Sequence, residues 1–111
     1  MEKMNQSPLE VLKGFCYYNF IKRDCQQASE YLSSDIHWFG TGENEDVYSK
    51  RDAVSYMKDE ISAFPESYEL DYIEESEQQL TDQIGTAFVK VNVTGGGLFL
   101  PCRISATTCT E

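Results

Sequence analysis

The sequence contains a single histidine, His37, and this residue is the natural candidate for acid–base chemistry. An unperturbed imidazole titrates near pH 7 and can act as a general base or a general acid. Asp35 lies two residues earlier, on the same face if the segment is a strand, and such a pair would raise the pKa of the imidazole and weaken it as a base. His37 and Asp35 are therefore the catalytic candidates, although a role of His37 as a polar residue of a pocket or of the surface is favoured over catalysis.

Several aromatic residues could line a pocket for a small molecule. Trp38 and Phe39 point to opposite faces of a predicted strand, so one packs in the core while the other could line a cavity or a subunit interface. Tyr17 and Tyr18 lie on the first predicted helix, and only one of them can face inward. Tyr56 borders the apolar stripe of a later helix. Each tyrosine is a candidate ligand contact or a buried structural residue.

Arg103 interrupts an apolar strand, where it shares a face with Phe99. A lone arginine in a strand must be solvated, paired with an acid such as Asp35 or Glu45, or bound to an anion. Aromatic and polar side chains of this kind are typical of a binding pocket, but they do not form a complete catalytic set. The predicted binding residues are Tyr18, His37, Trp38, Tyr56, Phe99 and Arg103. The predicted ligand is a small molecule, with an anionic group as one option because of Arg103.

No metal or cofactor site is predicted. The four cysteines (Cys16, Cys25, Cys102 and Cys109) contain no C-x-x-C pair and do not converge, so we expect buried, unpaired thiols in a cytoplasmic protein. The Gly-Thr-Gly of residues 40–42 lacks the lysine and helix of a phosphate-binding loop and is predicted to be a tight turn. Neither a calcium-binding loop nor a nucleophile beside its own base is apparent.

The net charge of −10 is concentrated in one region of the chain. Residues 42–84 contain thirteen acids and three bases, and the remainder is neutral. This excess argues against binding to nucleic acids or anionic membranes, and it predicts a solvated surface or a docking surface for a basic partner. The 111 residues suit a single domain, residues 1–111. No apolar run could span a membrane, and the N-terminus does not resemble a signal peptide.

Residues typical of helix N-termini predict three helices in the first half of the chain. Ser7 and Glu10 form a capping box that opens a helix ending near residue 22, and Asp24 opens a short second helix. Residues 35–39 and 47–48 are predicted to be short strands. Ser49 caps a third helix that Pro65 ends.

Alternation with a period of two follows Pro65. It predicts long strands around residues 68–72, 87–93 and 98–108, with a bulge at Ile73 and a turn at residues 95–97. The order helix, helix, strand, helix and antiparallel meander predicts an α+β fold.

This order of elements resembles the SnoaL-like branch of the nuclear transport factor 2-like superfamily, whose fold is also called ketosteroid isomerase-like. The resemblance covers nearly the whole chain and rests on residues 15–24 (FCYYNFIKRD), 31–35 (YLSSD) and above all 38–45 (WFGTGENE), then on residues 49–65 and 103–105. It implies three helices packed on a strongly curved antiparallel sheet that forms a cone with a cavity inside. Members resemble small ligand-binding or sensory modules of bacteria, and the superfamily also includes isomerases, cyclases, dehydratases and the association domain of calmodulin-dependent kinase.

The resemblance has further implications for function. Such domains usually close with another strand carrying a Trp and His, so this chain is either truncated at Glu111 or presents an open edge. In the kinase association domains, an arginine at the position of Arg103 often points into the cavity. We expect a non-enzymatic domain that binds a small molecule and forms a homodimer through the outer face of the sheet. The alternatives are an isomerase- or cyclase-like enzyme, with His37 or Asp35 as base and a tyrosine stabilising an enolate, and an oligomerisation module.

Overall fold

The computed structural model describes residues 6–34, 36–39 and 46–109. The fold is α+β, as predicted, and combines three α-helices with a three-stranded antiparallel sheet in the order β3-β4-β5. The elements in chain order are α1 (Pro8–Cys16), a π-helical turn η2 (Tyr17–Ile21), α2 (Cys25–Ser29), β1 (Trp38–Phe39), β2 (Asp46–Val47), α3 (Lys50–Ala63), β3 (Glu69–Gln79), β4 (Ile84–Gly95) and β5 (Leu98–Cys109). In this described part, no helix combines the length and apolarity needed to cross a membrane.

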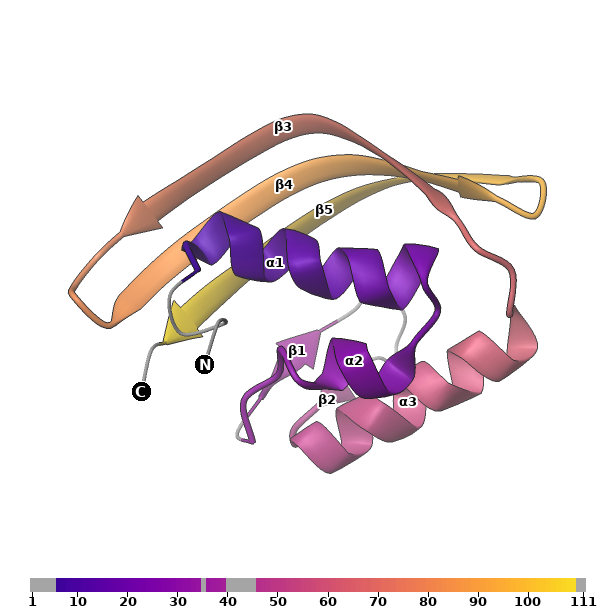
Figure 1. Ribbon diagram of the computed structural model, residues 1–111, viewed down its shortest axis with the longest axis horizontal. Helices are drawn as coiled ribbons and strands as arrows, with labels where there is room; N and C mark the ends of the chain where they lie inside the picture. The colour runs from indigo at the N-terminus through magenta and orange to yellow at the C-terminus, as the bar shows by residue number, and fades with distance from the viewer. Residues whose placement is uncertain (1–5, 35, 40–45, 110–111) are drawn as a thin grey trace.

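The elements form three layers. The long sheet curves over α1, while α2, α3 and the β1–β2 hairpin lie on the side of α1 that faces away from the sheet (Figure 1). The hairpin and the long sheet are separate, because β1 pairs only with β2 among the described strands. The first helix is therefore the central layer between the sheet and the other helices.

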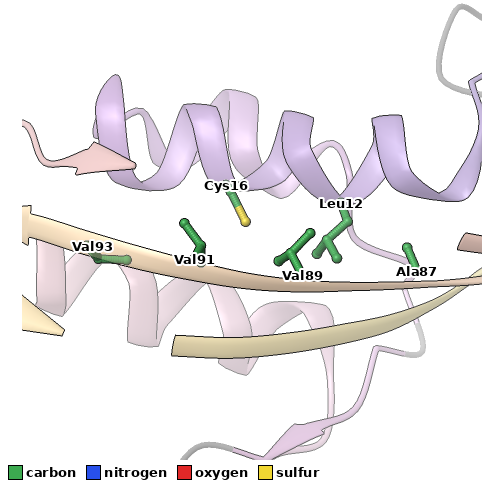
Figure 2. Packing of buried hydrophobic residues seen from close by; sticks show 6 residues of the cluster. All are labelled: Leu12, Cys16, Ala87, Val89, Val91 and Val93. Atoms are coloured by element: carbon green, nitrogen blue, oxygen red, sulfur yellow. The ribbon is translucent and has the colours of Figure 1, made fainter. Parts of the chain in front are cut away.

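The core lies between α1 and the middle strand. Leu12 and Cys16 point from α1 toward a row of side chains on one face of β4 (Figure 2). That row alternates along the strand and consists of Ala87, Val89, Val91 and Val93, all at most 3% exposed. Alternation in β4 thus buries every second residue against the helix, as expected for a sheet with one covered face.

All three predicted helix starts are confirmed. Ser7 accepts a hydrogen bond from the Glu10 amide and the Glu10 side chain accepts one from the Ser7 amide, which completes the capping box. Asp24 caps α2 and Ser49 caps α3 in the same way, each with a side-chain oxygen that accepts from the backbone three residues later. These caps satisfy amides that the first helical turn leaves unpaired.

The long sheet also follows its sequence signals. The register of β3 against β4 shifts between Tyr72 and Glu74, which places the predicted bulge at Ile73. The turn between β4 and β5 is confirmed, because Gly96 and Gly97 have φ of 56° and 82°, a region that glycine adopts without steric cost. All three strands are longer than predicted.

Two predictions need correction. The first strand was expected over residues 35–39, but only Trp38 and Phe39 pair with β2, and residues 35 and 40–45 lie outside the described part. The cysteines were expected to be buried, yet only Cys16 is, while Cys109 is exposed. The reason is that Cys109 lies on the same exposed side of β5 as Arg103 and Thr107, opposite the side that packs against the core. None of the four cysteines forms a disulfide.

Candidate functional site

The first helix changes its hydrogen-bonding pattern at Tyr17. The Lys22 amide donates to the Tyr17 carbonyl at 3.0 Å, a π-type bond that spans five residues. Such turns are rare inside helices and occur frequently at functional sites. Asn19 lies in this π-helical turn; the residue is only 8% exposed, and its Oδ1 has no hydrogen-bond partner among the described residues. A buried amide oxygen without a partner is costly and therefore calls for an explanation.

Asn19 was not among the residues predicted to line a site. Its spacing from Leu12 and Cys16 continues the apolar stripe of the first helix, where Asn is the wrong residue type. A polar residue at a position that the helical period assigns to the core is the signal that could have identified it.

Arg23 ties the π turn to the end of α3. It lies at φ 52°, and its side chain is 4% exposed. The guanidinium donates to the Asn19 carbonyl at 3.0 Å and to the Phe64 carbonyl at 2.6 Å, and it lies 3.5 Å from the Glu60 carboxylate and 4.9 Å from the Tyr68 ring centre. These contacts hold the backbone of Asn19 in place relative to α3.

An aromatic wall stands beside this turn. The Trp38 ring lies 6.4 Å from that of Phe15 at 62° and 6.1 Å from that of Tyr56 at 80°, both edge-to-face arrangements. The three rings come from β1, α1 and α3, so the wall depends on the packing of all three elements. A rigid aromatic surface of this kind suits stacking against a flat, apolar molecule.

An open hollow lies between the aromatic wall and β5. On the helix side its lining combines apolar and aromatic residues, among them Leu12, Phe15, Trp38, Tyr56 and Met57, with polar ones that include Asn19, His37 and Glu60. The sheet contributes Cys102, Ile104 and Ala106, which lie on the face of β5 that packs against the core. The hollow is accessible along β5, because this strand pairs with β4 alone among the described strands.

The structure brings together some of the predicted site residues. Trp38 and Tyr56 line the hollow side by side. His37 is exposed at its rim, with its ring 4.3 Å from that of Tyr48. Tyr18 is not among the lining residues, and its ring packs instead 6.0 Å from that of Tyr31.

Phe99 and Arg103 are exposed on the other face of β5. Cys102 and Ile104 alternate with them and pack against the core, so the Arg103 side chain is directed away from α1. The sequence placed Phe99 and Arg103 on one face, which the structure confirms. Arg103 is nevertheless among the residues that border the hollow, at the edge formed by β5.

The outer face of the sheet sets two bases opposite each other. Arg103 pairs with Lys90 in the β4–β5 register, and Lys90 lies 3.5 Å from the Glu74 carboxylate. No carboxylate of the described residues forms an ion pair with Arg103. Asp35 and Glu45, the partners suggested by the sequence, lie outside the described residues.

The buried thiol between helix and sheet is held in its neutral form. Burial raises the pKa of Cys16 from 9.0 to about 12, an effect that a hydrogen bond with Tyr72 partly opposes. Burial likewise raises the pKa of Tyr72, and the neighbouring Cys16 raises it further. A neutral thiol is a poor nucleophile and a poor metal ligand. The described residues contain no group of three or more His, Cys, Asp or Glu that could hold a metal ion.

Comparison with known proteins shows the fold. No protein-family model and no curated protein matches this sequence. A solved structure, that of an uncharacterised cystatin-fold protein from Novosphingobium aromaticivorans at 1.90 Å resolution, matches with a TM-score of 0.55 and 17% identity. The chain has a cystatin-like fold. The match covers 95% of this chain and 94% of that protein, so the likeness includes the whole arrangement of helices and sheet.

Proposed function

We propose that this protein binds a small organic molecule in the hollow between the aromatic wall and β5. The proposal goes beyond the cystatin-like fold, which is compatible with a roll-type binding domain. The observation that carries it is Asn19, a nine-tenths buried residue that lies beside the aromatic wall and whose side-chain oxygen has no hydrogen-bond partner among the described residues. Apolar pockets with a few placed polar groups are the usual form of small-molecule sites.

The chemistry of the hollow supports a flat, uncharged ligand with one hydrogen-bonding group. Phe15, Trp38 and Tyr56 offer aromatic surface, and the carboxamide of Asn19 can present either an acceptor or a donor after a half-turn about χ2. Arg103 is directed to the opposite face of β5. The anionic ligand considered at first therefore has less support than an aromatic alcohol, phenol or amide.

Trp38 makes the proposal directly measurable, because it is the only tryptophan of the chain. A panel of aromatic alcohols, phenols and amides should be titrated while the tryptophan fluorescence and the melting temperature are followed. We expect at least one class to change the fluorescence with saturation and to raise the melting temperature, since a ligand of the folded state stabilises it. A panel without any saturable signal would contradict the proposal.

Substitution of Asn19 separates binding from stability. Asn19→Leu removes the buried polar group, so it should leave the free protein as stable as the wild type or more stable. The same change should weaken the best ligand about 10-fold, since a hydrogen bond in a buried site contributes about 1.4 kcal/mol. Gln27→Leu makes a comparable change at an exposed position of α2 that does not line the hollow, and it should not alter the affinity. Unchanged affinity in Asn19→Leu would exclude the amide as a ligand contact.

A further inference from the structure

One edge of β5 carries backbone groups that β4 does not use. Gly95 and Leu98 close the two-residue β4–β5 turn and face each other in the register. In a hairpin of this kind the closing pair is hydrogen-bonded, so the even-numbered residues of β5 bond to β4 and the odd-numbered ones point to the free edge. The Leu80 amide, just after β3, donates to the carbonyl of Ile84, the first residue of β4. The backbone groups of even-numbered β4 residues therefore point toward β3, which agrees with this alternation.

Pro101 limits the usable part of this edge. Pro101 stands opposite Asn92 in the register, and the backbone groups of these two residues point away from each other. The N–H that proline lacks is therefore not needed for a hydrogen bond between β4 and β5. The same missing donor prevents pairing at the N-terminal end of the free edge. Donors remain on Arg103, Ser105 and Thr107, in the second half of the strand.

Charge distinguishes the two edges of the sheet. The opposite edge strand, β3, carries Glu69, Asp71, Glu74, Glu75 and Glu77 and no base. Two such edges would repel each other, which is a common protection against association. The sequence of β5 contains no acid and a single base, Arg103. The net charge of the chain is −10. Of the two edge strands of the long sheet, β5 is the one at which two copies can meet without placing carboxylates opposite each other.

We propose that two copies of this chain associate through their β5 edges as an antiparallel pair centred on Ala106. This centre uses the whole second half of the strand and places Ser105 of each copy opposite Thr107 of the other. Cross-strand pairs of Ser and Thr are favourable, and the small Ala106 side chains meet at the two-fold axis, where they allow close approach. The two Arg103 side chains are then separated by six residues of strand, about 20 Å.

The pairing is isologous, so it closes into a dimer and leaves no further β5 edge for growth. It joins two three-stranded sheets into one of six strands. The second copy also lies along the open side of the hollow, beside Ile104 and Ala106 on the core-facing side of β5. This proposal does not depend on ligand binding and can fail or succeed independently of it.

Proline at the free edge tests the proposal. Sedimentation equilibrium of the full chain should give twice the monomer mass of 12.7 kDa. Ser105→Pro removes an N–H that points away from β4, and it should weaken dimerisation at least 10-fold. Ser105→Ala loses the same hydroxyl but keeps the N–H, so it should remain dimeric, and far-ultraviolet circular dichroism verifies that both variants are folded. A dimer that survives Ser105→Pro would overturn the proposal in favour of another face, such as the outer face of the sheet.

Amide hydrogen exchange of the wild type provides a test without mutation. The amides of Arg103, Ser105 and Thr107 should exchange slowly in the dimer and faster on dilution. A protein that stays monomeric from micromolar to millimolar concentration would overturn the proposal, whether these amides are protected or not. Fast exchange of the three amides in a dimer would overturn it as well.

Discussion

Alkaline pH should destabilise this protein through the buried thiol of Cys16. The folded state keeps the thiol protonated until about pH 12, because burial raises its pKa from 9.0. In the unfolded chain the thiol ionises near its ordinary pKa, so between these values unfolding releases a proton. Stability contributed by Cys16 is therefore complete below pH 9 and is lost as the pH rises toward 12.

The expected size of this effect follows from the same two pKa values. Within the window, the free energy of unfolding should fall by about 1.4 kcal/mol per pH unit, and the loss between pH 8 and pH 10 should be about 1.4 kcal/mol. Tyr72 adds to the loss at higher pH, because its pKa is also raised. Groups that titrate equally in two variants cancel when the variants are compared.

Urea unfolding followed by circular dichroism at pH 8 and pH 10 measures the effect. Cys16→Ala should lower stability at both pH values, because it leaves a cavity, but its loss between them should be about 1.4 kcal/mol smaller than that of the wild type. Cys109→Ala, the same substitution at an exposed site, should keep the wild-type pH dependence. An identical pH dependence in Cys16→Ala and the wild type would refute the argument.

Three further substitutions test the packing around the site by urea unfolding. Arg23→Met should destabilise by about 2 kcal/mol, because it removes the buried guanidinium that donates to the Asn19 and Phe64 carbonyls. A loss below about 0.5 kcal/mol would show that these contacts are not important for stability. Gly14→Ala should destabilise by about 1–3 kcal/mol, because a Cβ at this position would lie 2.6 Å from the Tyr31 ring. This cost exceeds the gain from the higher helix propensity of Ala. A stabilised variant would contradict the packing of Gly14 against Tyr31. Ser49→Ala should cost about 1 kcal/mol, while Ser49→Asp, which restores a cap, should be neutral.

Features of the fold that depend on short-range chemistry could be predicted from the sequence. Ser7, Asp24 and Ser49 each place an oxygen acceptor three residues before an amide that needs one, and each opens a helix in the structure. The bulge at Ile73 was visible as a break in the alternation, and it occurs where the register shifts. These signals involve neighbours along the chain, so no knowledge of the tertiary structure is needed.

The candidate site was predicted less completely, because it depends on contacts between distant segments. Trp38 and Tyr56 were identified as aromatic residues, but the hollow they share also requires Phe15 and the π turn. Nothing local marks Arg23 as the residue that ties this turn to α3. The sequence grouped Arg103 with Phe99 on one face of its strand, but which face packs on α1 is decided by the apolar residues of β4 and β5 together.

The central claim is that a ligand occupies the hollow in contact with Asn19 and Trp38. The most direct measurement is a nitrogen–proton correlation spectrum recorded during titration with the strongest ligand from the fluorescence panel. The account predicts that the side-chain amide of Asn19 and the indole N–H of Trp38 shift together and saturate with one dissociation constant. Shifts confined to other residues, with both of these signals unchanged at saturation, would contradict it.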